Sequence, residues 1–308
     1  MPSRTLSIWR FRDGKPGHEQ QSLGLTTALG ELGPVDVLDI DVREHGSGLL
    51  DWLLGRFPAG ALKRRPDLLI GAGHATHLPM LAARRVAGGR IVVLMRPSLP
   101  AFLFDFIIAP EHDGLAPGER VLLTRGVLNA MRPAAKKAGS LLILLGGESR
   151  HAEWNNAAIQ QQIDAIIARQ KAGSLWRIAD SRRTPAELGQ ALREKYGERF
   201  QPWADCPPGW LAQRLAGTET VWVSEDSVSM LYEALSAGCR VGVLELPGAR
   251  RDGRVLAGVR RLAEAGLVTY FSAWDGRGGE LPQNLAPLNE AKRVAQYLMG
   301  KLEPNANA

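Results

Sequence analysis

Short apolar runs alternate along this chain with longer stretches in which apolar residues recur every three or four positions. The runs have the length of strands, and the stretches between them have the period of a helix. Strands that alternate with helices form parallel sheets with the helices packed against their faces. The pattern therefore predicts an α/β fold of two Rossmann-like lobes with parallel sheets and an interdomain cleft.

The predicted strands form two series, separated by a linker. Residues 132–139 lack apolar periodicity, carry charge and contain proline and glycine, which is typical of a domain boundary. We therefore assign 1–133 to an N-terminal lobe, 134–287 to a C-terminal lobe, and 288–308 to a helix crossing back to the first lobe and a tail. The predicted strands are 5–11, 35–40, 68–71, 91–94, 106–109, 121–124, 140–145, 175–178, 220–223, 241–244 and 268–270. The predicted helices are 20–29, a segment after Gly73 that reaches Val86, 157–168, 184–196, 229–237 and 256–265.

The composition indicates a globular protein that stays in the cytoplasm. The chain has 308 residues, of which 45% are hydrophobic and 23% charged, and its apolar runs are far too short to cross a bilayer. The N-terminus enters a strand directly, without an apolar leader, so export is not expected. Cys206 and Cys239 have neither pairing nor metal-ligand spacing, which suits a reducing compartment.

The charge balance favours acidic partners. The net charge is +6 and the pI is about 9.6, which suits nucleotide phosphates or anionic lipid. Peripheral contact with the inner face of a membrane, or with a lipid-linked acceptor, is compatible with this charge. No basic cluster has the aromatic interleaving of a nucleic-acid module, so no nucleic acid is expected, and the sequence identifies no protein partner.

A polar, glycine-containing loop follows the first predicted strand. It reads D-G-K-P-G-H-E-Q-Q and precedes the first helix. Glycines such as Gly17 let the backbone approach a ligand, and a helix start presents unpaired N–H groups to an anion. Lys15 adds positive charge, Gln20 adds hydrogen-bonding capacity, and His18 can exchange a proton near neutral pH. A simple turn capped by a histidine is the alternative, but it would not need these side chains together.

Two further loops follow strands of the first lobe. The first, G-A-G-H-A-T-H, contains Gly73 and His74, and we interpret it as a glycine-rich loop lining the acceptor side of the site. Its two histidines lack a nearby carboxylate, which makes a poor zinc site, so no metal is predicted. The second contains Arg96, which either clamps an anion or pairs with Asp113.

The second lobe contains a Gly-Gly turn and a hydroxyl-rich loop, each after a predicted strand. Backbone amides of a Gly-Gly turn, hydroxyls and a helix start all suit diphosphate oxygens, and a carboxylate one turn into the helix can hold a ribose diol. A capping box alone would explain one serine and one glutamate but not the whole polar run. The predicted donor-binding residues are Gly146, Gly147, Ser149, Ser224, Glu225, Asp226, Ser227, Ser229 and Glu233.

The order of these motifs resembles that of GT-B glycosyltransferases, in particular the UDP-N-acetylglucosamine transferase of peptidoglycan synthesis. The G-x-x-G-H loop, the second glycine loop, the Gly-Gly turn and an E-x-x-x-A-G-like segment around Glu233 follow one another as they do there. More specifically, the strings D-G-K-P-G-H, G-A-G-H-A-T-H, R-P-S, A-P-E-H-D and S-E-D-S-V-S-M resemble bacterial relatives of the plant "elongated mitochondria" fission-factor family over the full chain.

The resemblance implies transfer of a sugar from a nucleotide diphosphate donor to a hydroxyl acceptor, without a cofactor or an obligatory metal. The first lobe is then the acceptor side, with His18 as general base, and the second lobe holds the nucleotide sugar. The plant relatives imply an alternative, a non-catalytic adaptor that keeps the fold for membrane or partner recruitment. A nucleotide-sugar epimerase is a third interpretation, which the absence of a G-x-G-x-x-G loop and a Tyr-x-x-x-Lys pair disfavours.

Overall fold

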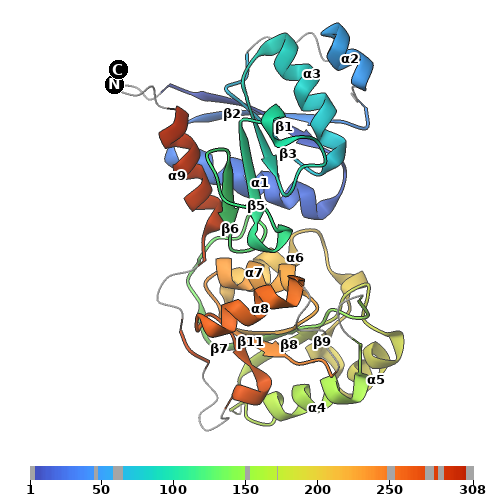
Figure 1. Cartoon of the computed structure of the whole chain (residues 1–308). Coiled ribbons are helices and arrows are strands. Elements are labelled where there is room, and N and C mark those ends of the chain that lie inside the picture. Colours follow the sequence, from blue (N-terminus) through green and yellow to red (C-terminus); the bar gives the residue numbers. More distant parts are fainter. Residues whose placement is uncertain are drawn as a thin grey trace. The chain divides into compact units, whose positions relative to one another are not determined.

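The computed structural model describes residues 4–44, 48–57, 65–149, 153–171, 173–247, 254–274, 281–283 and 288–302. The chain divides into two compact units (Figure 1). The first unit comprises residues 1–130 and 289–308, and the second comprises 131–288.

The first unit is built on a six-stranded parallel sheet, in the order β2-β1-β3-β4-β5-β6. Strand β3 is buried along its whole length, which fits its apolar sequence L-L-I-G-A, because a sheet covered on both faces needs apolar residues at consecutive positions. The strands are β1 (Leu6–Arg12), β2 (Val35–Asp41), β3 (Leu68–Ala72), β4 (Arg90–Leu94), β5 (Phe106–Pro110) and β6 (Val121–Thr124).

Helices cover both faces of this sheet. One core joins α1 (Pro16–Leu32) and α9 (Glu290–Leu302) to the sheet, and α9 lies beside α1 although the two are at opposite ends of the chain (Figure 1). The other core joins α3 (His77–Ala87) to the opposite face. A short helix, α2 (Leu49–Leu54), is in contact with α3 but buries none of its own residues.

The second unit repeats this plan with the strand order β12-β11-β10-β7-β8-β9, and all its strand pairs are parallel. Helices α6, α7 and α8 pack on one face and α4 and α5 on the other. The strands are β7 (Lys137–Leu144), β8 (Leu175–Ala179), β9 (Phe200–Gln201), β10 (Thr218–Ser224), β11 (Arg240–Leu244) and β12 (Thr269–Tyr270). The helices are α4 (Asn156–Ile167), α5 (Ala186–Tyr196), α6 (Trp210–Gly217), α7 (Val228–Ser236) and α8 (Arg254–Glu264).

The first helix departs from the sequence-based expectation. It begins at Pro16 rather than near Gln20, so His18 and Gln20 belong to the helix and not to the loop before it. Proline suits this position because its missing N–H would be unpaired there and its fixed φ matches the helix. The apolar pattern alone did not predict α2 or α6. No helix in the described ranges combines the length and hydropathy that a bilayer crossing needs.

Candidate functional site

A histidine–aspartate pair lies where β1 passes into α1. Nδ1 of His18 is 2.8 Å from Oδ2 of Asp13, whose side chain is only 2% exposed. A carboxylate only accepts hydrogen bonds, so the contact assigns a proton to Nδ1 and leaves the lone pair on Nε2. No group in the described ranges hydrogen-bonds to Nε2. The His18 side chain is 20% exposed, so the arrangement holds the ring in one orientation and leaves a basic nitrogen available.

Gly73 is the neighbour that makes room for this pair. A Cβ at this position would lie 2.4 Å from both Cε1 and Nδ1 of His18 and 3.2 Å from Oδ2 of Asp13. The backbone φ of Gly73 is +84°, which residues with a side chain rarely adopt. The segment after β1 and the loop after β3, both singled out from the sequence, therefore meet. The imidazole of His18 packs against the backbone of Gly73.

The other predicted residues of the first two loops are exposed. Lys15 is the residue before α1, and its amide donates to Oδ1 of Asp13 at 3.1 Å, so it helps to fix the carboxylate through its backbone. Gly17, Gln20 and His74 present exposed surface nearby in the chain. No Cβ contact would arise within 4 Å at Gly17, so that glycine is not required for packing.

Arg96 is hydrogen-bonded to Asp113, but each bond uses a backbone group and the two side chains do not form an ion pair among the described residues. Its amide donates to Oδ2 of Asp113 at 2.9 Å, and its Nη1 donates to the Asp113 carbonyl at 3.3 Å. The preceding residue, Met95, has φ +76°, the one positive value at a non-glycine position in the described ranges. Its sulfur accepts a hydrogen bond from the buried Gln21 of α1 at 3.2 Å, which ties this strained turn to the helix carrying His18.

His77 is a core residue. Its side chain is buried, its Nδ1 is 3.1 Å from the Ser98 hydroxyl, and its ring centroid is 5.2 Å from that of Phe104. Burial, together with the nearby charge of His74, lowers the pKa of His77 to about 4. The residue is therefore neutral near pH 7 and contributes packing.

In the second unit the Gly-Gly turn and the hydroxyl-rich loop are bonded to one another. The Gly146 amide donates to the Ser224 hydroxyl at 2.7 Å, and the Gly147 amide donates to Oδ2 of Asp226 at 3.0 Å. A Cβ on Gly146 would lie 2.0 Å from Oδ2 of Asp226 and 2.2 Å from Oγ of Ser227. Both amides that we expected to face a diphosphate are thus engaged by side chains of the neighbouring loop.

Arg183 closes this cluster, although no sequence motif pointed to it. Its Nη1 is 2.8 Å from Oδ2 of Asp226, and its Nη2 donates to the Ser227 hydroxyl at 3.1 Å. The Arg183 side chain is 44% exposed, whereas the Asp226 side chain is fully buried. Oδ1 of Asp226 is also buried and has no hydrogen-bond partner among the described residues. The cluster therefore presents one exposed cation, Arg183, which is held by a buried carboxylate.

The remaining predicted donor residues lie in the same loops or in α7. Glu225 is fully buried and accepts a hydrogen bond from the Leu246 amide at 2.7 Å, so it links the loop after β10 to the segment after β11. Ser149 is half-buried, two residues after the Gly-Gly turn. Ser227 directly precedes α7, and Ser229 is exposed in its first turn. Hydroxyls and the start of this helix accordingly follow the carboxyl end of β10.

Glu233 lies on α7, away from the β10 loop by one helical turn. Burial raises the pKa of its carboxyl to about 7, and no cation in the described ranges offsets this effect. Near neutral pH the carboxyl is thus partly protonated, and a protonated carboxyl can donate as well as accept a hydrogen bond. That property would suit recognition of a sugar diol.

The raised pKa of Glu233 predicts that the free energy of unfolding depends on pH. The folded protein retains a proton that the unfolded chain releases above about pH 4.5, so the free energy of unfolding decreases as pH rises from there to about 7. The Glu233→Gln variant lacks this titration. Its stability relative to wild type should rise by about 2 kcal/mol between pH 5 and pH 8. Urea unfolding of both proteins at the two pH values measures the difference between their free energies of unfolding. A difference that does not change with pH would contradict the raised pKa of Glu233.

The structure brings together some of the predicted residues of each unit. His18 and Gly73 meet in the first unit, and Gly146, Gly147, Ser224, Asp226 and Ser227 meet in the second. Sequence reasoning missed Asp13 and Arg183 as side-chain partners. Asp13 was in the selected motif, and its place directly after a strand and five residues before His18 could have indicated the pair. Arg183 follows β8 in a loop without a motif, so no local signal marked it.

Comparison with known proteins gives a family and a fold. The profile of the mitochondrial fission ELM1 family matches residues 16–302 of this chain. The mitochondrial fission protein ELM1 of Arabidopsis thaliana is 21% identical over 313 residues, covering 89% of this chain and 70% of that protein. A putative UDP-N-acetylglucosamine 2-epimerase from Listeria monocytogenes is similar in structure, with a TM-score of 0.56, 10% identity, and coverage of 97% of this chain and 96% of that chain. MurG of Acinetobacter baumannii has a TM-score of 0.51, 15% identity, and coverage of 96% and 99% respectively.

At these identities the structural likeness shows the fold. This likeness confirms the α/β architecture of two Rossmann-like units with parallel sheets, which the alternation of strands and helices predicts. The fold is that of GT-B proteins.

Proposed function

Because this chain belongs to the mitochondrial fission ELM1 family and has the fold of nucleotide-sugar proteins, we propose that it transfers a sugar from a nucleotide diphosphate to a hydroxyl acceptor. The second unit would bind the donor, and the first unit would supply the base. The similar Listeria protein is named for an epimerase of UDP-N-acetylglucosamine, which supports a nucleotide sugar as the ligand class.

The pairing of His18 with the buried Asp13 is the observation that carries this proposal. In the proposed reaction Nε2 of His18 takes the proton of the acceptor hydroxyl as that oxygen forms a bond to the anomeric carbon. The bond from this carbon to the diphosphate oxygen breaks at the same time, and the nucleotide diphosphate leaves with the electron pair. Asp13, 2.8 Å from Nδ1, orients the ring and stabilises the imidazolium that forms.

Donor binding would use the loops after β7 and β10. Arg183 is the exposed cation of this cluster and would offset phosphate charge. The buried Asp226 would hold Arg183 in place for this contact through their 2.8 Å ion pair, and the partly protonated Glu233 would contact the ribose. Each role follows from hydrogen-bonding capacity that is present in the described residues.

Product analysis tests the proposed reaction. The full chain is incubated with a panel of nucleotide diphosphate sugars and a mixture of lipid-linked and free hydroxyl acceptors, and released nucleotide diphosphate is quantified by chromatography. We expect release with one donor, dependent on added acceptor. Absence of release with every donor and acceptor would contradict transfer.

One observation favours a second candidate, a non-catalytic scaffold that recruits partners. Ser224 and Asp226 already occupy the amides of Gly146 and Gly147, and the Asp226 carboxylate is a negative charge where a diphosphate would be seated. An adaptor would keep this loop closed by its own side chains. Nucleotide binding without turnover, or no binding at all, would favour this candidate.

A further inference from the structure

A pocket of about 590 Å³ lies at the edge of the second unit where its strands begin. Its wall includes Ser140 near the start of β7, Leu175 at the start of β8 and Thr218 at the start of β10. All strands of this sheet run in parallel, so the loops that carry Gly146 and Asp226 lie at the opposite edge, after the strands end. The pocket is therefore separate from the candidate donor site.

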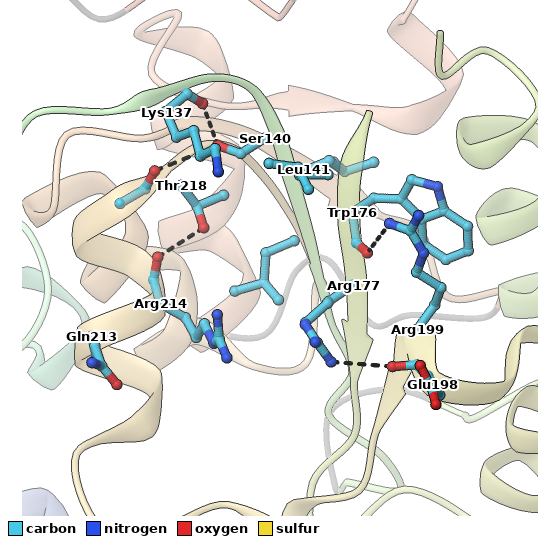
Figure 2. A pocket seen from close by; sticks show the side chains of 13 residues that line it. Lys137, Ser140, Leu141, Trp176, Arg177, Glu198, Arg199, Gln213, Arg214 and Thr218 are labelled. Carbon is cyan, nitrogen blue, oxygen red and sulfur yellow. Dashed lines mark hydrogen bonds between the residues drawn. The ribbon is translucent and has the colours of Figure 1, made fainter. Parts of the chain in front are cut away.

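The pocket carries an excess of positive charge. Four cationic side chains line it, against the single carboxylate of Glu198. Figure 2 shows Arg177 and Arg214 extending from β8 and α6 toward the same space. Among the described residues no carboxylate forms an ion pair with any of the four cations, which are Lys137, Arg177, Arg199 and Arg214.

Neutral groups hold the three guanidinium groups in place. Arg177 donates to the carbonyl of Glu198 at 3.1 Å. Arg199 donates to the carbonyl of Trp176 at 3.2 Å and lies 5.0 Å from the centroid of the Trp176 ring (Figure 2). Arg214 lies 5.6 Å from the ring centroid of Trp210. Carbonyls and rings position a cation without cancelling its charge, so these side chains have little conformational freedom left to lose on binding an anion.

The chemistry of this lining fits a phosphate ester. Guanidinium groups bind phosphate oxygens through paired N–H donors, and the exposed Lys137 adds an ammonium group. The volume lies within the range of about 300–1,000 Å³ that small-molecule sites occupy. Leu141 and the exposed Leu175 supply an apolar wall for the organic part of such a ligand.

We propose that this pocket binds the phosphoryl group of an organic phosphate, as a second anion site beside the sugar-transfer function. A free phosphate ester and a phospholipid headgroup present the same chemistry, so the experiment has one arm for each source.

The test compares two double variants of the full chain. Arg177→Gln/Arg214→Gln removes two pocket cations, whereas Arg193→Gln/Arg260→Gln removes two exposed arginines of α5 and α8 that do not line the pocket. Isothermal titration with inorganic pyrophosphate covers the free ligand. Co-sedimentation with phosphatidylcholine vesicles, with and without phosphatidylglycerol, covers the lipid. If the pocket variant does not fold, Lys137→Gln/Arg214→Gln, at two exposed positions, replaces it.

We expect wild type to bind one of the two probes, and the pocket variant to bind it at least ~10-fold more weakly, since each lost charge-assisted hydrogen bond is worth about that much. The control should change by less than ~3-fold, because distant exposed charges are screened. Loss confined to pyrophosphate identifies a free phosphate, and loss confined to anionic vesicles identifies a headgroup. No binding of either probe by wild type, or binding by the pocket variant that is no weaker than binding by the control variant, would overturn the proposal.

Discussion

The His18→Ala variant is expected to transfer sugar ~10²–10⁴-fold more slowly than wild type, the usual contribution of a positioned general base. The reason is the geometry at the start of α1, where Asp13 holds Nδ1 at 2.8 Å and Nε2 has no partner among the described residues. His18 is partly exposed, so its loss should lower the melting temperature only slightly. Turnover is measured as nucleotide diphosphate released per enzyme at saturating donor.

The Asp13→Asn variant keeps His18 but removes the carboxylate that orients its ring, so it tests whether that orientation matters for turnover. An asparagine amide in place of the carboxylate would favour the wrong tautomer of His18, so turnover should fall while donor affinity stays the same. Asp39→Asn is the matched control, because Asp39 lies in the same unit on β2 and pairs with Arg10 rather than with His18. A folded His18→Ala variant with full turnover would remove His18 from the mechanism.

The Gly147→Ala variant is expected to lose about 3 kcal/mol or more of its free energy of unfolding. A Cβ at this position would lie 1.8 Å from the carbonyl oxygen of Arg183 and 2.0 Å from its carbonyl carbon. These are backbone atoms, which cannot rotate away as a side chain can, so the loops after β7 and β8 would have to separate. Urea unfolding followed by circular dichroism measures the loss.

Gly217→Ala is the matched control for this substitution. Gly217 lies in the same unit, a Cβ added there would have nothing within 4 Å, and its φ is not positive. The substitution should change stability by less than about 1 kcal/mol. If the two variants unfold at the same urea concentration, the close approach of the two loops is wrong.

The sequence predicted the architecture well because the central strands of both sheets are buried on both faces. Strands such as β3 and β4 are almost wholly apolar, and each is followed by a glycine or polar turn, so their limits are visible without tertiary information. The first turn of α1, which carries His18, and the loop with Gly73 follow the adjacent strands β1 and β3. They lie next to each other because the carboxyl ends of adjacent parallel strands share one edge of a sheet.

The features of the candidate site that the sequence did not reveal depend on tertiary contacts. Arg183 reaches Asp226 and Ser227 from a loop that is distant in the chain, and nothing near Arg183 distinguishes it from Arg182. The raised pKa of Glu233 arises from burial by the surrounding fold, which its neighbours on α7 do not encode. The engagement of the Gly146 and Gly147 amides by side chains likewise depends on how the loops after β7 and β10 meet.

Ligand binding by the second unit tests the central claim most directly. Thermal and urea unfolding of the full chain are measured with and without nucleotide diphosphates and nucleotide diphosphate sugars. At about 100 times its dissociation constant, a bound ligand should raise the free energy of unfolding by roughly 2.7 kcal/mol, and nucleosides that lack the diphosphate should not. No stabilisation by any of these compounds at millimolar concentration would contradict nucleotide-sugar binding and favour the adaptor.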